Sequence, residues 1–374
     1  MNRRKRGAER FADAPLDGAL LDVVAVKTAF ETDHGLVRAV DGVSFSLERG
    51  KTIGIVGESG CGKSVLSRSI MGLLPSNARR SGSILFEGRE IGDAPADVMR
   101  DYWGTQMAMV FQDPMTSLNP VMKIGKQITE SLRYHLDVSK DYATETAQAL
   151  LQSVGIPEAK RRLREYPHQL SGGMRQRVMI AIALACGPKL LFADEPTTAL
   201  DVTVQAQILD LLQAQQRERF MAMVLVTHDL GVVAGRTDDI AVMYAGRIVE
   251  KAPTRSLFAQ VRHPYTEALL KSIPKLTHPS HTRLEAIAGR PPDLVSPPPG
   301  CKFAPRCPYA QDRCLTEEPP LLDGGIPGHE FRCWFPVGTE AGKEALGRNL
   351  AAGTTAAGQP VRVEQDAVVT EAVS

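Results

Sequence analysis

The chain has 374 residues, of which 43% are hydrophobic and 5% aromatic, and its formal net charge is +1 at pH 7. This length allows one large domain or two modest ones with a sizeable core. The near-neutral charge argues against a nucleic-acid-binding protein, which usually has a basic excess. No apolar run reaches the roughly 18–20 residues that a transmembrane helix needs.

The N-terminus carries five basic residues between Arg3 and Arg10. A signal peptide would continue into an apolar segment, whereas residues 8–17 are mixed and polar. We therefore expect residues 1–18 to form a disordered basic arm. A weak attraction to anionic lipid head groups is the alternative.

The first predicted elements are strands. Residues 20–26 alternate in hydrophobicity, and residues 39–47 do so with a break at Asp41-Gly42. Residues 51–56 form a β-rich run that leads into a glycine-rich loop, and residues 64–74 have the pattern of a helix. The run at 83–86, followed by Glu87-Gly88, indicates a hairpin.

Helical and strand patterns alternate over the next part of the chain. Residues 107–111 predict a strand, and the period is then helical from 115 to 185, which indicates an inserted helical subdomain. Strands return at 190–193, at 221–226 and in a hairpin over 240–250. Strands that alternate with helices predict an α/β fold with a parallel core.

The character of the sequence changes after Pro253. Proline pairs and triplets appear from Pro291 to Pro299, and four cysteines follow between Cys301 and Cys333. We place a domain boundary near 255 and expect a separate extension over 256–336. Residues 337–374 contain no aromatic residue and much Ala, Gly, Thr and Glu, so we expect a disordered tail.

The loop after the 51–56 strand matches the phosphate-binding P-loop pattern in full, between a strand and a helix. Its glycines allow backbone N–H groups to curl around phosphates. Lys63 reaches the β- and γ-phosphates, and the Ser64 hydroxyl is offered to Mg²⁺. The predicted ATP-binding residues are Gly57, Glu58, Ser59, Gly60, Cys61, Gly62, Lys63 and Ser64.

A second stretch indicates another anion site. In Leu170-Ser171-Gly172-Gly173-Met174-Arg175-Gln176-Arg177, the Ser-Gly-Gly triplet opens a helical run. Its free N–H groups and the helix dipole suit an anion. Because the chain already has its own P-loop, this site suggests the γ-phosphate of a nucleotide held by another copy or a partner.

These eight residues resemble the signature of the ATP-binding-cassette (ABC) ATPases. The resemblance implies a RecA-like P-loop core with an antiparallel β subdomain and an α-helical subdomain. We accordingly expect the ATPase domain over 19–255 with its helical subdomain at about 115–185, followed by the cysteine-containing extension.

The resemblance also implies roles for single residues. Asp194, which ends an apolar strand, would bind Mg²⁺, and Glu195 would be the base that polarises the attacking water. Gln112 resembles the glutamine that contacts Mg²⁺ and that water, and His228 resembles the histidine that contacts the γ-phosphate. Ala199-Leu200-Asp201 resembles the loop that touches the partner subunit. Phe30 and His34 are both open as the residue that stacks on adenine.

One chain carries one P-loop and one signature, and by resemblance these cannot serve the same nucleotide. Two cassettes would meet head to tail around two ATP molecules, and each site would combine the P-loop of one chain with Ser171, Gly172 and Gly173 of the other. Closure driven by ATP requires that ATP bind the closed state better.

Longer strings resemble the D-type ATPase subunit of dipeptide, oligopeptide and nickel importers. They are residues 112–120, 166–169, 194–205 and 263–270. The resemblance implies an ATPase that energises peptide import at the cytoplasmic face of the inner membrane. Its partners would be a second, related ATPase, two membrane permeases and, indirectly, an extracytoplasmic solute-binding protein.

Other functions stay open beside peptide import. The same machinery would import nickel or another small solute if its permeases were different. A soluble ABC ATPase acting on nucleic acid is disfavoured by the net charge and by the single cassette. A non-catalytic regulatory subunit is disfavoured by the intact Lys63, Asp194, Glu195 and His228.

The chain has six cysteines. Cys61 and Cys186 are interpreted as plain small residues, with Cys61 open to alkylation near the nucleotide. In a cytosolic protein, clustered thiols favour metal over disulfide, and four thiolates suit zinc or an iron–sulfur cluster. By resemblance to the family's C-terminal extension we favour a [4Fe–4S] cluster on Cys301, Cys307, Cys314 and Cys333, with zinc or no metal as the alternatives.

Overall fold

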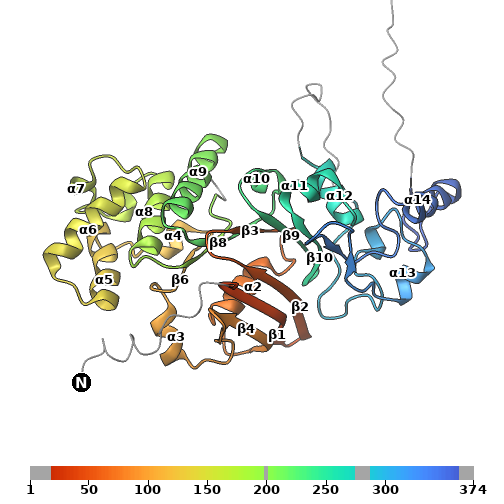
Figure 1. Cartoon of the computed structure of the whole chain (residues 1–374), viewed down its shortest axis with the longest axis horizontal. Coiled ribbons are helices and arrows are strands. Elements are labelled where there is room, and N and C mark those ends of the chain that lie inside the picture. The colour runs from red at the N-terminus through yellow and green to blue at the C-terminus, as the bar shows by residue number, and fades with distance from the viewer. Residues whose placement is uncertain (1–17, 198–200, 274–286, 362–374) are drawn as a thin grey trace, which may run out of the picture. The chain divides into compact units, whose positions relative to one another are not determined.

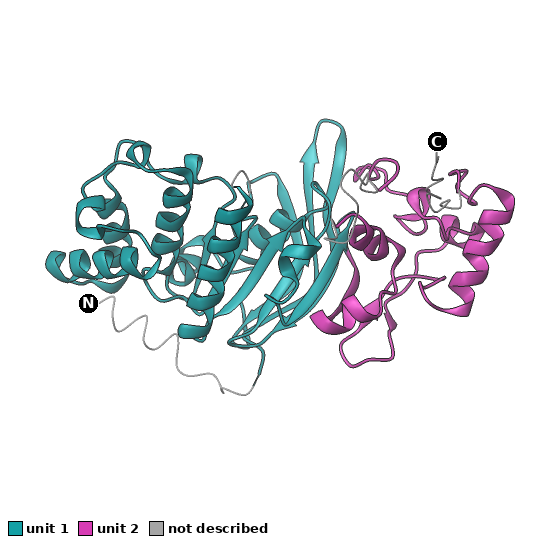
Figure 2. Ribbon diagram, turned by 90° about the horizontal axis from the view of Figure 1, so that it is seen from above, with its two compact units in different colours: residues 1–247 teal, residues 248–374 magenta. Residues whose placement is uncertain are grey.

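A computed structural model describes residues 18–197, 201–273 and 287–361, and these fall into two compact units that meet in sequence after Arg247. Figure 2 shows unit 1 in teal and unit 2 in magenta. The predicted basic arm, residues 1–18, lies outside the described part except for Gly18. Ala199 and Leu200 of the predicted partner-contacting loop also lie outside it.

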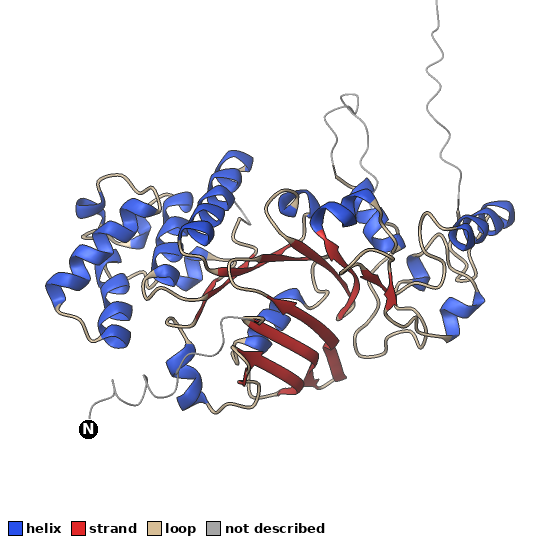
Figure 3. Cartoon of the chain, viewed as in Figure 1, coloured by secondary structure: helices blue, strands red, loops and turns tan. Residues whose placement is uncertain are grey.

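Unit 1 contains an antiparallel sheet. Its strands β1 (Leu21–Thr32), β2 (Gly35–Leu47), β4 (Ala78–Phe86) and β5 (Arg89–Glu90) pair in the order β2-β1-β4-β5. Figure 3 shows β1, β2 and β4 as a group apart from the parallel strands. The break expected at Asp41-Gly42 is wrong. The ladder to β1 continues on both sides of Gly42, whose φ of 76° fits a local irregularity in the register.

The second sheet of unit 1 has a parallel core. Strands β3 (Thr52–Val56), β6 (Met107–Val110), β7 (Leu190–Asp194), β8 (Ala222–Thr227) and β9 (Asp239–Tyr244) run in the order β9-β3-β8-β7-β6. Every residue of β3, β7 and β8 is buried. Such continuous apolar runs are typical of parallel strands covered on both faces. The carboxyl ends of β7, β3 and β8 therefore lie side by side.

Helices of unit 1 connect these strands. The helix α2 (Lys63–Ile70) follows β3, α3 (Ala96–Tyr102) precedes β6, and α9 (Val202–Glu218) and α10 (Leu230–Val233) flank β8. Between β6 and β7 the chain is helical throughout, and α5, α6 and α8 pack on one another (Figure 1). These helices are α4 (Pro114–Ser117), α5 (Ile124–Leu136), α6 (Lys140–Ser153), α7 (Ala159–Arg162), the 3₁₀ turn η1 (Pro167–Gln169) and α8 (Gly172–Leu184).

Unit 2 is built from short elements. A small antiparallel ladder joins β10 (Arg247–Pro253) to β12 (Glu330–Phe331), which also pairs with β11 (Leu322–Asp323). The helices are α11 (Thr254–Ala259), α12 (Pro264–Lys271), the 3₁₀ turn η2 (Ala304–Arg306), α13 (Asp312–Thr316) and α14 (Glu340–Ala352).

A fully buried carboxylate organises unit 2. Glu250 accepts hydrogen bonds from the backbone N–H groups of Arg262 (2.7 Å) and His263 (2.9 Å), and its Oε1 lies 2.9 Å from Nε2 of His329. His263 in turn begins α12, because its Nδ1 accepts the N–H of Tyr265 at 3.1 Å. Burial lowers the pKa of His263 to about 4, so this ring is neutral at pH 7.

The expectation of a disordered tail is wrong for its described part. Residues Glu340–Ala352 form α14, capped at its start by the Thr339 hydroxyl and ended by Gly353 at φ 73°. The helix buries Gly342, Ala345 and the polar Asn349, and no large apolar residue. The composition of this helix therefore resembles that of a disordered segment. Residues 362–374 of the predicted tail lie outside the described part.

Candidate functional site

The P-loop connects β3 to α2, and two of its glycines are required by close backbone approach. A Cβ on Gly57 would overlap the carbonyl oxygen of Met243, and a Cβ on Gly62 would overlap that of Ala39. Gly62 also has φ 103°, a conformation that favours glycine. The loop is thus held from outside by main-chain groups, and from inside by the N–H of Cys61, which donates to the Glu58 carbonyl at 3.3 Å. A glycine-rich loop of this kind can present its other N–H groups to a phosphate.

Lys63, the first residue of α2, is buried, with 4% of its side chain exposed. Its Nζ donates to the carbonyl oxygens of Gly57 at 2.8 Å and Glu58 at 3.1 Å. It also lies 3.6 Å from Oε1 of Glu195. The ammonium group therefore sits inside the curl of the loop, where a phosphate chain would pass.

Ser64 and Asp194 form a pair of oxygens beside the loop. The Ser64 hydroxyl donates to Oδ1 of Asp194 at 2.7 Å. Burial raises the pKa of Asp194, and the Ser64 hydrogen bond and the Arg68 charge only partly offset this. A hydroxyl and a carboxylate in contact at a strand end are ligands that suit Mg²⁺.

Glu195, which follows β7, is the point at which the predicted residues converge. Its Oε2 accepts from Nε2 of Gln112 at 3.2 Å and lies 3.4 Å from Nδ1 of His228. Its Oε1 faces Lys63. Gln112 follows β6 and His228 follows β8, so two strand ends and α2 bring side chains to the carboxylate that follows β7.

The backbone of Glu195 is itself unusual. Its φ is 45°, in the left-handed region that non-glycine residues seldom adopt. The N–H of Glu195 donates to the carbonyl of Val226 on β8 at 3.0 Å, which ties the turn to the neighbouring strand. Strained backbone of this kind concentrates at functional sites.

The signature residues lie at the start of α8, as the sequence predicted. Ser171 is the N-cap, and its hydroxyl accepts the N–H of Met174 at 3.3 Å. No hydrogen bond or ion pair among the described residues joins Ser171, Gly172 or Gly173 to the P-loop. The two predicted anion sites of this chain are therefore separate in the single subunit.

One neighbour of the site was missed by the sequence analysis. The charge of Arg68, one turn beyond Ser64 on α2, acts on the Asp194 carboxylate. Its four-residue spacing from Ser64 was the available signal, since residues four apart share one helix face.

Phe30 lies on β1 and His34 in the turn to β2, and both stay predictions for adenine stacking.

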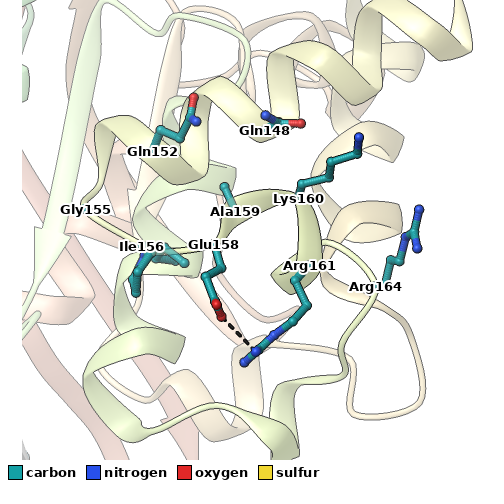
Figure 4. Close-up of a pocket in the computed structure, with 10 residues that line it drawn as sticks. Gln148, Gln152, Gly155, Ile156, Glu158, Ala159, Lys160, Arg161 and Arg164 are labelled. Carbon is teal, nitrogen blue, oxygen red and sulfur yellow. Dashed lines mark ion pairs between the residues drawn. The ribbon is translucent and has the colours of Figure 1, made fainter.

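A large open hollow lies elsewhere in unit 1, and no predicted nucleotide residue lines it. Its volume is about 820 Å³, and it is formed by the end of α6, the following loop and α7. Figure 4 shows Lys160 and Arg164 pointing away from the Glu158–Arg161 ion pair, which measures 2.8 Å. The hollow does not belong to the site around Glu195.

Comparison with known proteins decides the family. Residues 40–198 match the family model described as ABC transporter, and residues 249–314 match the oligopeptide/dipeptide transporter C-terminal region. The chain is 50% identical over 319 residues to the oligopeptide transport ATP-binding protein OppD of Escherichia coli, covering 85% of this chain and 94% of that protein. The chain belongs to the ABC transporter ATP-binding proteins. It is an ATPase.

Further relatives and solved structures agree. The ATPase is 47% identical to the dipeptide transport ATP-binding protein DppD of Escherichia coli, over 88% of this chain and all of that protein. A solved dimer of the cassette MJ0796 in a post-hydrolysis state with ADP and Pi has a TM-score of 0.57 at 26% identity, covering 63% of this chain and 99% of that one.

A solved cassette, cbiO1 of Clostridium perfringens, has a TM-score of 0.55 at 28% identity, covering 65% of this chain and 92% of that one. These findings confirm the resemblance to the ABC family and the RecA-like P-loop fold expected from the sequence. The match over 249–314 also confirms the resemblance to the dipeptide and oligopeptide group.

The cysteines of this ABC ATPase separate into two kinds. Cys61 and Cys186 lie in unit 1, and burial raises the pKa of each thiol to about 11, which argues against the alkylation-sensitive Cys61 considered above. In unit 2 one small cavity is lined by Cys301, Cys307, Cys314 and Cys333, all of them free thiols. Burial and the nearness of the other thiols raise the pKa of Cys307.

A metal site is not supported by ligand geometry. Among the described residues, no group of three or more His, Cys, Asp or Glu side chains is placed to hold a metal ion. The expected cysteine-bound cofactor therefore stays a prediction.

None of the ATPase's described helices is both long and apolar enough to cross a bilayer.

Proposed function

We propose that this ATPase powers the import of peptides through a membrane ABC transporter. One observation carries the proposal: about half of the residues are identical, over nearly the full length, to proteins named for oligopeptide and dipeptide transport. The match extends to the oligopeptide/dipeptide transporter C-terminal region. The site around Glu195 supports an active role, because its four convergent side chains are those that ATP hydrolysis needs.

The geometry supports one role for each residue. Lys63 would neutralise the β- and γ-phosphates from inside the loop, and Ser64, Asp194 and Gln112 would hold Mg²⁺, which would offset phosphate charge. Glu195 would orient and deprotonate the attacking water, with its carboxylate held by Gln112. His228 would contact the γ-phosphate. The remaining P-loop residues, Gly57 to Gly62, would bind the phosphates through backbone N–H groups.

The separation of the two anion sites supports a two-subunit machine. Ser171, Gly172 and Gly173 make no described contact with the P-loop, so they are left to face a nucleotide on a second ABC ATPase. We assign this chain to a heterodimer with a related ATPase, bound peripherally to two permeases at the cytoplasmic face of the inner membrane. An extracytoplasmic binding protein would deliver the peptide.

We propose that the four thiols of unit 2 bind a [4Fe–4S] cluster. The chemistry of the donors supports this, although their placement does not, since four cysteine sulfurs are the usual ligands of such a cluster and all four line one cavity. Cys301, Cys307, Cys314 and Cys333 would hold it. When bound, the cluster would cross-link segments of a unit that has few regular elements of its own.

Transport is tested in vesicles that contain this ATPase with its co-purifying subunits. We expect ATP-dependent uptake of a labelled dipeptide or tripeptide and none of nickel, with uptake lost in Glu195→Gln. Uptake of nickel and not of peptides would replace the proposal with the alternative importer. ATPase activity without uptake of any solute would contradict both.

The cluster is tested by anaerobic purification with iron, sulfide and zinc analysis. We expect about four irons and four sulfides per chain, lost in Cys307→Ser and retained in Cys186→Ser, a matched change of a cysteine outside the cavity. Zinc in place of iron, or no metal in the unmodified chain, would contradict the cluster and leave the ATPase assignment intact.

A further inference from the structure

We propose that unit 2 carries a second ligand site, which takes a small zwitterion of the free amino acid class with an apolar side chain. The site is a cavity of about 320 Å³. This volume falls in the range of small-molecule pockets. None of the residues around Glu195 and none of the four cysteines lines it, although Pro264 and Phe303 line both this cavity and the thiol cavity.

Four segments that are far apart in sequence build the cavity. They are α12, residues 287–288, the η2 region from Phe303 to Pro308, and the turn from Thr355 to Val361. That turn is held in place: the N–H of Thr355 donates to the Gln359 carbonyl at 2.8 Å, and the N–H of Val361 donates to the Gly353 carbonyl at 3.0 Å. The cavity thus has a built wall on the side of the chain's last described residues.

The wall at residues 287–288 is fixed by a buried cation. Arg306 is 7% exposed, and its guanidinium donates to the carbonyl of Ala288 at 2.8 Å and to that of Ile287 at 3.2 Å. The same guanidinium lies 5.9 Å from the centre of the Phe303 ring. Arg306 therefore holds the wall rather than serving as the charge that meets the ligand.

Besides Arg306, the cavity is lined by one charged side chain of each sign. Glu267 and Lys271 both lie on α12, one turn apart, and their closest atoms are 3.5 Å from each other. Oε2 of Glu267 accepts the Tyr309 hydroxyl at 3.0 Å, so the carboxylate is oriented by a third residue.

This arrangement matches an amino acid by charge and by polarity. A ligand ammonium group would pair with Glu267 while the adjacent carboxylate paired with Lys271, whose flexible side chain is 53% exposed. The Gln359 side-chain amide has no hydrogen-bond partner among the described residues and lines the same cavity. The apolar part of the ligand would rest on Phe303, Ile287 and Val361.

The test is calorimetric titration of the purified full-length chain with L-leucine, an amino acid that has both charges and an apolar side chain. L-leucinamide lacks the carboxylate and N-acetyl-L-leucine lacks the ammonium group, so we expect each to bind at least about tenfold more weakly, since each loses one charged hydrogen bond. The titration needs no permease, so its result is independent of the transport test.

Variants locate the site. Glu267→Gln and Lys271→Gln are each expected to weaken L-leucine binding about tenfold or more. The matched controls are Glu344→Gln and Arg348→Gln, which change an ion pair of the same spacing on α14, 3.7 Å long and outside the cavity. We expect these controls to bind as the unmodified chain does.

Three results would overturn the proposal. One is no heat of binding from the unmodified chain at L-leucine concentrations up to about 10 mM. Another is binding that Lys271→Gln leaves unchanged. Because the Lys271 side chain is half-exposed, we expect this variant to fold, and a parallel thermal unfolding curve checks this. Binding lost equally in the α14 controls would also contradict the assignment.

Discussion

Two side chains from separate loops and the P-loop lysine meet at the Glu195 carboxylate, and each contact has a consequence for its chemistry. The Gln112 amide and the His228 ring both face Oε2, while Lys63 faces Oε1. A carboxylate held by several donors has a fixed orientation. A fixed base can act on a water molecule aligned with a phosphate, which is the requirement for general base catalysis.

Replacing Glu195 with Gln keeps the shape of this side chain and removes the base. We expect ATP hydrolysis to fall by about 100-fold or more, while ATP binding through the P-loop is retained. Turnover by the assembled transporter and binding of a fluorescent ATP analogue measure the two effects. Glu145→Gln, an exposed change on α6, is the control, and normal turnover in Glu195→Gln would refute the assigned role.

The P-loop glycines allow a sharper comparison. In Gly57→Ala the new Cβ would overlap the Met243 carbonyl, which cannot move unless its strand β9 moves as well. We therefore expect the free energy of unfolding to fall by about 2 kcal/mol or more and ATP binding to be lost. Gly60→Ala is the matched variant, because nothing lies within 4 Å of its Cβ and only its φ of 79° is strained. Equal effects of the two changes would contradict the packing argument.

At the scale of elements, the turn between β4 and β5 is tied to two other segments by charge. Glu87 accepts from Nζ of Lys189 at 2.8 and 3.0 Å and pairs with the Arg49 guanidinium. Burial raises the pKa of Glu87, but the Lys189 and Arg49 interactions outweigh it, so the pKa lies below its usual value. The ionised form is therefore stabilised in the folded chain.

This pKa shift predicts a pH dependence. Because the folded-state pKa of Glu87 is below the unfolded value, its contribution to stability is present above about pH 4.3 and is lost as pH falls through the folded pKa. Glu87→Gln should destabilise unit 1 by roughly 1–2 kcal/mol at pH 7 and by less in acid. Urea unfolding at pH 7 and pH 4 checks this, with Glu130→Gln on α5 as control; a difference independent of pH would contradict it.

Some elements could be predicted from sequence for a physical reason. The strands β6, β7 and β8 lie within one or two residues of their predicted positions, because each is an unbroken apolar run ended by polar residues, and such runs are buried on both faces. The P-loop followed from its motif spacing, and the polar residues at those strand ends followed from the resemblance to the ABC family. Their convergence on Glu195 follows from the parallel order of the strands.

Other elements had no comparable signal. The helix α14 packs through Gly342, Ala345 and Asn349 without a large apolar residue, and its Ala, Gly and Glu content is shared by disordered segments. The gathering of Glu267, Phe303 and Gln359 around one cavity depends on contacts between segments far apart in the chain, which periodicity does not record. The left-handed backbone at Glu195 likewise has no signature in a glutamate.

At the scale of the whole molecule, one chain carries two predicted anion sites, the P-loop and the start of α8, with no hydrogen bond or ion pair between them among the described residues. The Ser171 hydroxyl caps α8, so a test must keep the cap while changing the site. Asp caps helices as well as Ser does but carries a negative charge. Ser171→Asp therefore opposes an anion from the partner subunit without unfolding the helix.

We expect Ser171→Asp to leave ATP binding at the chain's own P-loop unchanged and to reduce turnover of the two-subunit assembly about tenfold or more by like-charge repulsion. Ser171→Asn, a neutral cap, should have a smaller effect. Phosphate release by the assembly and nucleotide binding by the isolated chain are the measurements. Equal turnover in the Asp and Asn variants would argue against a phosphate at this helix end.

The φ of 45° at Glu195 has an evolutionary consequence. A left-handed conformation costs a non-glycine residue about 1–2 kcal/mol, which Gly avoids and Asn tolerates. Gly or Asn at position 195 would therefore relieve strain while removing the base. A laboratory selection of this ATPase for thermal stability alone would accumulate such changes and yield more stable but inactive proteins. The glutamate would therefore persist only where ATP turnover itself is under selection.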